Sequence, residues 1–494
     1  MKDTYDLGLM LDSRVPLIVI ETYDEKRATD TIIKVAKKRK RNIFRWSVTD
    51  GLIRLNFGPQ VASVAEHTDP KAILEHIKAS LTPAIFVLCD FHPYLNDEPL
   101  HVRLLKDIAQ HHSHIPNTLV FLSHQLKVPA ELSRYSAVVK MSLPSDEEIM
   151  AIVREEAKHW SETHANKRVK TDAETIDKLV ANLRGMSHAE VHRLARGAIV
   201  DDGAISEEDI PEINKAKFDL MEMDGVLSFE YDTDKFSNVG GLTRLKAWLE
   251  ERREPFLKDG DVNVDVPKGI MLMGIQGSGK SLAAKCIAGV WGLPLLRMDF
   301  GALYNKFFGE TERNLREALK LAEVMSPCVL WLDEIEKGIS QDQNDTGTSQ
   351  RVLGTLLTWM MERKVKVFMV ATSNDITRLP PELVRKGRLD EIFFVDLPSL
   401  DVRREIFSIH LTKRDYSMDA DELTVLAEAS DGFSGAEIEQ AVVAAIYTSA
   451  AQGQDLSCSL VLEEIRNTSP LSVVMAEKIA GLRQWADGRT VSAN

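Results

Sequence analysis

"KGIMLMGIQGSGKSLAAKCIAGVWG", residues 268–292, is the stretch from which the fold of this chain can be worked out. It opens with an apolar run, continues with the glycine-rich loop "GIQGSGKS" (274–281) and ends in a helical pattern. A buried strand that turns through glycines into a helix matches the phosphate-binding pattern G-x-x-x-x-G-K-[ST]. The glycines let successive backbone N–H groups face phosphate oxygens, because no Cβ atom stands in the way. We therefore expect a nucleoside triphosphate site in an α/β domain.

The residue types in this loop suit a magnesium-bound triphosphate. Lys280 carries the positive charge that the β- and γ-phosphates attract, and Ser281 offers a hydroxyl ligand to Mg²⁺. The residues of this segment that we expect to bind ATP are Gly274, Ile275, Gln276, Gly277, Ser278, Gly279, Lys280, Ser281 and Leu282.

Two later apolar runs end in polar side chains that complete such a site. "CVLWLDE" (328–334) places Asp333 where it can hold Mg²⁺, and Glu334 is then free to orient and deprotonate the attacking water. "VFMVATSND" (367–375) ends near Asn374, which we expect to hydrogen-bond the γ-phosphate and the attacking water. Thr372 is the alternative for that role.

Two arginines, Arg385 and Arg388, follow in "LVRKGRLDE" (383–391). A guanidinium group beside a transferring phosphoryl group accelerates the transfer by about 10³ to 10⁵. Arginines at the end of a helix are more often solvated, so this pattern gains weight only from the motifs that precede it.

The bulk composition limits the class of protein. The chain has 494 residues, too many for one hydrophobic core, and 61 Lys and Arg against 75 Asp and Glu give a formal charge of -14. Net acidity disfavours nucleic acid and anionic membranes as partners. Its four cysteines form no CxxC pair, and neither a signal peptide nor an apolar run of membrane-spanning length is found. We therefore expect a cytoplasmic protein with reduced thiols and no membrane segment.

Apolar runs alternate with helical patterns in both halves of the chain. In the second half the runs begin at residues 270, 293, 328, 367 and 391, which predicts a parallel sheet that is buried on both faces. After residue 399 the patterns are helical only, and we expect a small helical lid there. The first half has the same order of apolar runs and helical patterns, with less distinct boundaries between them.

Segments of the two halves also resemble one another. They are "PAIFVLCD" (83–90) and "PCVLWLDE" (327–334), "FLSHQLKVPAEL" (121–132) and "ATSNDITRLPPEL" (371–383), and "GMSHAEVHRLARGAI" (185–199) and "GFSGAEIEQAVVAAI" (432–446). Short apolar patterns can match by chance, but the matches keep their order and nearly their spacing. This favours an ancient duplication.

Taken together, the second-half motifs resemble the AAA ATPases, specifically their protein-remodelling branch. They are "FSNVGGL" (236–242), "GIQGSGKS", "NKFFGETERNLREA" (305–318), "CVLWLDEIE", "ATSND", "PPELVRKGRLDEIFFVDLP" (380–398) and "DGFSGAEIEQAVVAA" (431–445). The sequences of these motifs are most similar to those of AAA domain-containing proteins encoded in bacterial and plastid genomes. The resemblance spans about two-fifths of the chain.

This resemblance implies roles for further residues. Val239 and Gly240, with Gly241, would line the adenine pocket, and Gly435 and Ala436 would contact adenosine from the lid. Arg385 and Arg388 match the paired arginine fingers, which reach the nucleotide of a neighbouring subunit. The resemblance therefore implies self-assembly, in this family usually into a ring of six subunits.

The segment "NKFFGE" (305–310) matches the pore loop of the family, which faces the central channel of the ring. Its residues here are Lys306, Phe307, Phe308 and Gly309. Core packing is the alternative for the two phenylalanines. Adjacent aromatic residues flanked by polar ones do not suit a single buried face, so exposure is favoured. Aromatic faces can grip an extended polypeptide because apolar contact is non-directional.

The first half lacks this chemistry. Where the second half has its phosphate loop, the first has "ETYDEKR" (21–27), with three acids and no glycine. Cys89 and Asp90 stand opposite Asp333 and Glu334, and His124 stands opposite Asn374. We interpret this half as an ATPase-like domain that kept the fold and lost the chemistry, with a role in ring assembly or substrate recruitment.

The predicted architecture is an α/β chain with two unequal halves. An N-terminal degenerate P-loop-like α/β domain precedes an AAA domain, whose parallel sheet is flanked by helices and followed by a small helical lid. The expected divisions are 1–145 for the degenerate domain, 146–215 for a small helical subdomain, 216–235 for a linker, 236–398 for the AAA large subdomain and 399–494 for the lid with a C-terminal helix.

The functional hypothesis is a magnesium-dependent ATPase that remodels, unfolds or disassembles a protein partner. ATP and Mg²⁺ are the expected substrate and cofactor, and Glu334, Asn374, Arg385 and Arg388 are the expected catalytic residues. One alternative is an ATPase that loads or remodels nucleic-acid complexes. Another is a slow nucleotide-dependent switch or scaffold that threads nothing.

Overall fold

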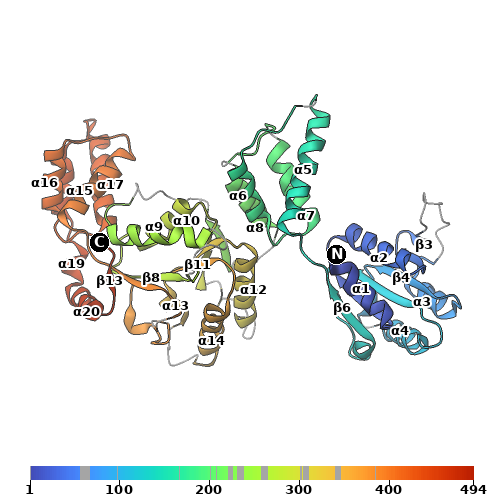
Figure 1. Ribbon diagram of the computed structural model, residues 1–494. Coiled ribbons are helices and arrows are strands. Elements are labelled where there is room, and N and C mark those ends of the chain that lie inside the picture. The colour runs from blue at the N-terminus through green and yellow to red at the C-terminus, as the bar shows by residue number, and fades with distance from the viewer. Residues whose placement is uncertain are drawn as a thin grey trace. The chain divides into compact units, whose positions relative to one another are not determined.

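The structure is a computed structural model of the chain (Figure 1). The residues that it describes are 2–55, 67–96, 98–165, 167–200, 202–206, 209–220, 226–230, 239–257, 265–300, 303, 311–339, 346–383, 385 and 387–494. By internal contacts the chain divides into two compact units. One comprises Met1–Glu156 and Gly185–Arg196, and the other comprises Ala157–Arg184 and Gly197–Asn494.

The first unit is built around a six-stranded sheet in the order β3-β2-β4-β5-β1-β6. Its strands are β1 (Leu17–Glu21), β2 (Asn42–Ser47), β3 (Gly51–Arg54), β4 (Ala84–Cys89), β5 (Thr118–Ser123) and β6 (Ser136–Lys140). Every residue of β4 and β5 is buried, as expected of apolar runs in the middle of a parallel sheet. The β2–β3 pair is antiparallel, and the other pairs are parallel.

Alternate residues along each central strand supply the cores on the two faces of this sheet. Leu17 belongs to a core completed by helices α3 (Pro70–Ala79) and α4 (Pro99–His111), whereas its neighbour Ile18 belongs to the core beneath α1 (Lys2–Asp12) and α2 (Glu25–Lys38). Two short 3₁₀ helices, η1 (His92–Leu95) and η2 (Ser133–Tyr135), follow β4 and precede β6. The sheet is therefore covered on both faces.

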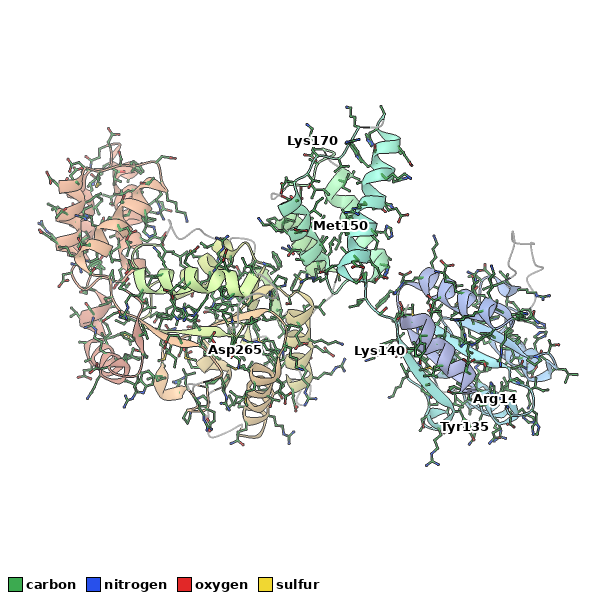
Figure 2. The ribbon with its side chains drawn as sticks, viewed as in Figure 1. Arg14, Tyr135, Lys140, Met150, Lys170 and Asp265 are labelled. Atoms are coloured by element: carbon green, nitrogen blue, oxygen red, sulfur yellow. The ribbon has the colours of Figure 1, made fainter. Side chains whose placement is uncertain are left out.

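Four helices follow the first sheet, after β6 ends at Lys140 (Figure 2). They are α5 (Asp146–Thr163), α6 (Ala173–Leu183), α7 (His188–Val200) and α8 (Asp209–Asp219). Lys217 of α8 is a buried cation. Its ammonium group donates to the backbone carbonyls of Asn182, Arg184 and Val324, at 2.9, 2.7 and 2.9 Å. These bonds fix α8 to two other segments of the second unit.

The second unit contains a seven-stranded sheet in the order β13-β12-β8-β11-β10-β9-β7. Its strands are β7 (Leu227–Glu230), β8 (Gly269–Gly274), β9 (Leu295–Met298), β10 (Cys328–Leu332), β11 (Val367–Ser373), β12 (Glu391–Val395) and β13 (Val491–Ser492). The five apolar runs expected to form strands correspond to β8 to β12. The prediction of helices alone after residue 399 was wrong, because β13 pairs in parallel with β12.

Helices again cover both faces of this sheet. The core on one face contains Ile270 of β8 and residues of α9 (Thr243–Leu257) and α10 (Lys280–Trp291). The core on the other contains Met271 and residues of α12 (Thr311–Val324), α13 (Ile335–Ile339) and α14 (Thr346–Glu362). The 3₁₀ helix η4 (Ile376–Arg378) follows β11.

The lid has a small core of its own around Phe407 and Val442. It is formed by α15 (Leu400–Thr412), α16 (Ala420–Ala429), α17 (Gly435–Gln452) and α18 (Cys458–Asn467), and α19 (Leu471–Val474) and α20 (Ala476–Ala486) follow. This agrees with the helical lid expected from the sequence.

The two sheets share one strand order. From its antiparallel edge the first is β3-β2-β4-β5-β1-β6, and the second is β7-β9-β10-β11-β8-β12 with β13 added. The antiparallel edge strand follows its partner in the first unit but precedes it in the second. A duplicated α/β plan predicts this shared order, and the edge strands show where the copies differ.

None of the described helices is both long and apolar enough to cross a membrane. All four cysteines are free thiols, and Cys89, Cys286 and Cys328 are buried.

Candidate functional site

The phosphate loop leaves β8 and enters α10 through glycines that the backbone requires. Gly277 and Gly279 have φ angles of 75° and 94°, a backbone region that residues with a Cβ atom rarely adopt. Gly274 lies so close to β12 that a Cβ atom there would be 2.0 Å from the carbonyl oxygen of Val395. At Gly279, the N-cap of α10, no atom of the described residues lies within 4 Å of a Cβ position. The start of α10 is therefore open to an anion.

Lys280 lies against this loop as a buried cation. Its ammonium group donates to the carbonyl oxygens of Ile275 at 2.6 Å and Gly274 at 3.1 Å. Burial lowers the pKa of Lys280 to about 8, although the nearby carboxylates of Glu336, Asp333 and Glu334 oppose that shift. A desolvated ammonium group held by neutral carbonyls gains strongly from a phosphate anion, which is the property expected of a triphosphate site.

The carboxylate of Asp333 at the end of β10 is held from two sides. The Thr372 hydroxyl of β11 donates to its Oδ1 at 2.8 Å, and Arg297 of β9 donates to its Oδ2 at 2.9 Å. Three neighbouring strands thus fix one carboxylate. Thr372 was expected from the sequence as the alternative partner of the γ-phosphate. In the structure its hydroxyl contacts both acidic residues, because it also accepts the backbone N–H of Glu334 at 3.0 Å.

Glu334 has a left-handed backbone with φ of 47°, which is uncommon for a residue other than glycine. Its Oε1 accepts the side-chain amide of Asn374 at 3.1 Å, and its Oε2 forms an ion pair with Lys337. The structure therefore brings together Glu334 and Asn374, two of the expected catalytic residues. A strained backbone that aims a carboxylate is typical of functional sites.

Glu336 is a residue of this cluster that the sequence interpretation missed. It is buried, its Oε1 accepts the backbone N–H of Asn374 at 2.9 Å, and its Oε2 has no partner among the described residues. It therefore positions the Asn374 backbone. Arg297 and Lys337 were missed as well. In the sequence, Arg297 is only a charged residue of the preceding strand, and Lys337 is only a charged residue of the short helix that follows Glu334.

The donor set of this site fits Mg²⁺. Mg²⁺ prefers oxygen ligands, and the loop offers the exposed hydroxyl of Ser281 while β10 offers the carboxylate of Asp333. Ser281 lies in the first turn of α10, next to Lys280.

The expected adenine-side segment is clamped between the lid and the C-terminal segment. A Cβ atom at Gly240 would lie 2.8 Å from Ile406 of α15, and Gly241 donates its N–H to Glu405 at 2.9 Å. Lys246 donates to the carbonyl of Val239 at 2.7 Å. Residues after β13 contribute too, because the Leu242 N–H donates to the side chain of Asn494.

The start of α17 touches the phosphate loop directly. The backbone N–H of Ala436 donates to the carbonyl of Gly277 at 3.1 Å, and a Cβ atom at Gly435 would lie 3.5 Å from the same oxygen. Gln276 is exposed, and Ser278 donates to the carbonyl of Ile275 at 2.7 Å. The glycine and alanine of the lid thus lie beside the loop, and their contact with adenosine stays a prediction. Leu282 packs partly buried against the core beneath α10.

Among the described residues, the two arginines form no hydrogen bond or ion pair with Asp333, Glu334 or Asn374. Arg385 is exposed, and Arg388 donates to the backbone carbonyl of Glu382. The expected pore-loop residues, Lys306, Phe307, Phe308 and Gly309, lie outside the described residues.

At the corresponding edge of the first sheet, the described residues form no phosphate cradle. At the start of α2 the carboxylate of Asp24 accepts the backbone N–H of Arg27 at 3.2 Å, so the helix N-terminus is capped by an anion of its own chain. Cys89 replaces Asp333, and burial raises the pKa of its thiol, so this residue stays neutral. Asp90 keeps the left-handed backbone of Glu334, with φ of 49°.

Three family models match the chain. The model of the ATPase family associated with various cellular activities (AAA) matches residues 270–397. The SpoVK-like AAA ATPase N-terminal domain matches residues 3–141, and the second domain of the same proteins matches residues 147–224.

Curated relatives extend over the whole chain. The uncharacterized AAA domain-containing protein ycf46 of Guillardia theta is 36% identical over 97% of this chain and 94% of its own length. The ycf46 protein of Pyropia yezoensis is 35% identical over 100% of both chains. The proteasome-activating nucleotidase of Aeropyrum pernix is 36% identical over 44% of this chain and 56% of its own length.

Proposed function

Because this chain belongs to the AAA family of ATP hydrolases, with full-length similarity to the ycf46 AAA domain-containing proteins, we propose that it couples ATP hydrolysis at subunit interfaces to the remodelling of a protein partner. The observation that carries the proposal is the hydrogen bond between Glu334 and Asn374 beside Lys280, which is bound to the loop carbonyls, while Arg385 is exposed to solvent. One chain holds the base and the phosphate cradle, and the arginines remain for a neighbour.

In the proposed reaction, Glu334 takes the proton of the attacking water, and Asn374 holds the carboxylate of Glu334 in place through its side-chain amide. Thr372 holds Asp333 in place by donating its hydroxyl to the carboxylate, and Glu336 holds the Asn374 backbone by accepting its N–H. Lys280 leaves the loop carbonyls for the β- and γ-phosphates. Bound Mg²⁺, held by Ser281 and Asp333, would neutralise charge on the phosphate oxygens.

Arg385 and Arg388 would act on the nucleotide of a neighbouring subunit. Their guanidinium groups would stabilise the negative charge that develops on the transferring phosphoryl group. AAA proteins generally form rings that act on proteins, and we propose a six-membered ring for this chain. A cytoplasmic location remains part of the proposal.

The protein-remodelling role rests on relatives. Similarity extends to the proteasome-activating nucleotidase and to a cell division cycle protein 48 homolog of Archaeoglobus fulgidus, which is 30% identical over 58% of this chain. We propose that Phe307 and Phe308 grip the partner polypeptide by apolar contact. The net charge of -14 disfavours a polyanionic substrate.

Mixing two inactive variants tests the interface site. Arg385→Ala removes the donated arginine, and Glu334→Gln removes the base, so each variant alone should lose ATP turnover by about 10² or more. In mixed assemblies, a Glu334→Gln subunit supplies Arg385 to a neighbour that retains Glu334. ATP turnover should therefore reappear on mixing.

Glu317→Gln on α12 is the matched control for the carboxylate change, because Glu317 is an exposed residue of the same type outside the site. It should turn over ATP like the unaltered chain. Full activity of Arg385→Ala, or no recovery in assemblies shown to contain both variants, would contradict the interface site.

The remodelling role has its own test. Phe307→Ala with Phe308→Ala should keep ATP turnover and lose ATP-dependent unfolding of a reporter protein bound by the chain. Unchanged unfolding by this variant would argue for a switch or scaffold instead.

A further inference from the structure

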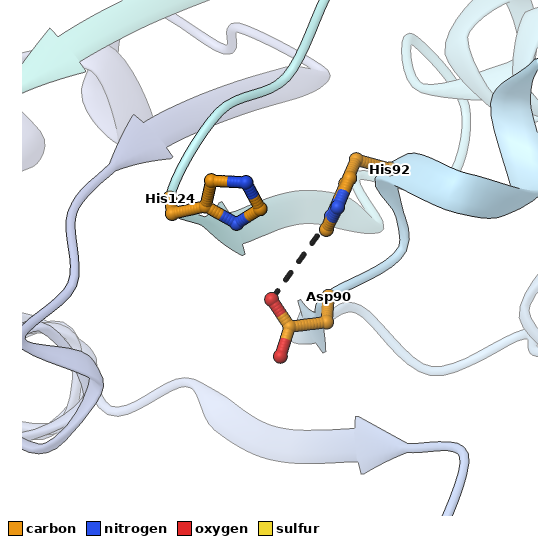
Figure 3. Close-up of side chains that lie close together, drawn as sticks. All are labelled: Asp90, His92 and His124. Carbon is orange, nitrogen blue, oxygen red and sulfur yellow. Dashed lines mark ion pairs between the residues drawn. The ribbon is translucent and has the colours of Figure 1, made fainter. Parts of the chain in front are cut away.

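Three potential metal ligands meet at one edge of the first sheet (Figure 3). Asp90 directly follows β4, His92 begins the 3₁₀ helix η1, and His124 directly follows β5. β4 and β5 are parallel neighbours, so their carboxyl ends lie side by side. One ligating atom of each residue lies within 4.8 Å of those of the other two. The carboxyl edge of a parallel sheet is where α/β proteins commonly bind ligands.

A hydrogen bond to Ser123 orients the imidazole ring of His92. The Ser123 hydroxyl lies 2.7 Å from Nδ1 of His92 and donates its proton to the carbonyl of Gln125 at 3.2 Å. In the Nδ1–H tautomer of His92, the hydroxyl accepts from Nδ1–H and Nε2 carries the lone pair that binds a metal ion. Such a bond from the second ring nitrogen is typical of metal-ligating histidines.

The other two residues are also held in place. The Tyr23 ring stacks on His124 with centroids 5.7 Å apart, and the rings of His92 and His124 meet edge to face at 4.7 Å. The backbone N–H of Asp90 donates to the carbonyl of Leu122 on β5 at 2.9 Å. Its carboxylate is left exposed, 4.0 Å from Nδ1 of His92.

We propose that Asp90, His92 and His124 form a binding site for one divalent transition-metal ion of the zinc class. Two imidazoles and one carboxylate suit Zn²⁺, Co²⁺ or Ni²⁺, whereas Mg²⁺ and Ca²⁺ prefer oxygen ligands throughout. Zinc–ligand bonds of about 2.0 to 2.2 Å place tetrahedral ligand atoms roughly 3.4 Å apart. Small rotations of these partly exposed side chains close the remaining gap. Three protein ligands leave one coordination position to solvent or to an external ligand.

The site occupies the place in the first sheet that Glu334 and Asn374 occupy in the second. Asp90 corresponds to Glu334 and shares its left-handed backbone, and His124 corresponds to Asn374. We infer that the first sheet, which has no phosphate loop, binds a metal ion at the edge where the second sheet is proposed to bind ATP. The three ligands belong to the first unit, whereas the phosphate loop belongs to the second.

Titration of the nucleotide-free, chelator-treated full chain with Co²⁺ tests the site, with visible absorption and calorimetry as readouts. We expect one Co²⁺ per chain, displaced by Zn²⁺. His92→Ala or His124→Ala should weaken binding at least tenfold, and the double variant should lose it.

His114→Ala is the matched control, because His114 is exposed and precedes β5, at the opposite end of that strand. It should bind Co²⁺ like the unaltered chain, as should Asp333→Asn, which alters the ATP site alone. Circular dichroism of the double variant should match the unaltered chain. Equal binding by a folded double variant, or displacement of Co²⁺ by millimolar Mg²⁺, would overturn the proposal.

Discussion

At the scale of single residues, Lys280 shows how a binding site is prepared before its ligand arrives. Its ammonium group is buried against two backbone carbonyls, which neutralise none of its charge. Desolvation therefore lowers its pKa to about 8, despite the three acids nearby. A phosphate anion supplies the missing counter-charge and favours the protonated form. ATP binding should therefore be coupled to protonation of this lysine.

ATP affinity should consequently fall as the pH rises. With a pKa of about 8 in the free protein, Lys280 is mostly protonated at pH 7 and roughly one-tenth protonated at pH 9. We expect the Kd for ATP of the Glu334→Gln protein, which does not turn over, to increase about tenfold per pH unit above pH 8. Titration with a fluorescent ATP analogue between pH 7 and 9.5 measures this.

Lys280→Arg keeps its charge throughout this range, so any binding that it retains should be independent of pH. A Kd that stays constant to pH 9.5 in the lysine protein, while its melting temperature is unchanged, would show that Lys280 does not titrate there.

At the scale of elements, α7 and α17 begin with the same cap. Ser187 and Ser434 each accept from the backbone N–H three residues on, and Glu190 and Glu437 each accept the backbone N–H of their serine at 2.7 Å. This reciprocal capping box explains why the chain repeats a Ser-x-Ala-Glu segment. The two copies differ in their surroundings, because α17 also touches the phosphate loop.

Removing each cap should separate stability from binding. Ser187→Ala and Ser434→Ala should each lower the free energy of unfolding by about 1 kcal/mol. Ser434→Ala should also weaken ATP binding several-fold, because the N–H of Ala436 that bonds Gly277 lies in the first turn of the destabilised helix. Calorimetric unfolding and ATP titration provide the two measurements.

Ser187→Ala is thus the matched control for the binding effect. If both variants weakened ATP binding equally, the effect could not come from contact between α17 and the loop. If neither did, the cap would serve only the helix.

At the scale of the whole molecule, two sheets of the same strand order differ in their chemistry. The second sheet ends in a glycine cradle, a buried lysine and paired acids, whereas in the first the helix after β1 is capped by Asp24. Fold alone does not confer nucleotide binding, since the site residues determine it. The chain should therefore have one nucleotide site.

We expect calorimetry of the Glu334→Gln protein to give one ATP per chain. Lys280→Ala should remove this binding altogether, because the described residues of the first unit form no second cradle. A stoichiometry near two, or binding that survives Lys280→Ala, would contradict this assignment. The Ser187→Ala protein, altered only in the first unit, should keep the stoichiometry of one.

Local sequence patterns were enough to predict the secondary-structure elements and the residue types of the site. The phosphate loop, the acids after β10, the polar end of β11 and the helical lid were all predictable, because strand burial, glycine turns and helix caps are properties of short segments. The degenerate character of the first half followed in the same way, from missing glycines and misplaced acids.

Which distant side chains meet depends on how the strands pair and pack. Arg297 reaches Asp333 because β9 and β10 are paired, and β13 joins the sheet beside β12, although neither pairing is visible in local periodicity. The cluster of Asp90, His92 and His124 arises in the same way, because the ends of β4 and β5 are adjacent although His124 lies far from the other two in the chain. Pairing of parallel strands depends on long-range packing, and a one-dimensional pattern does not carry that information.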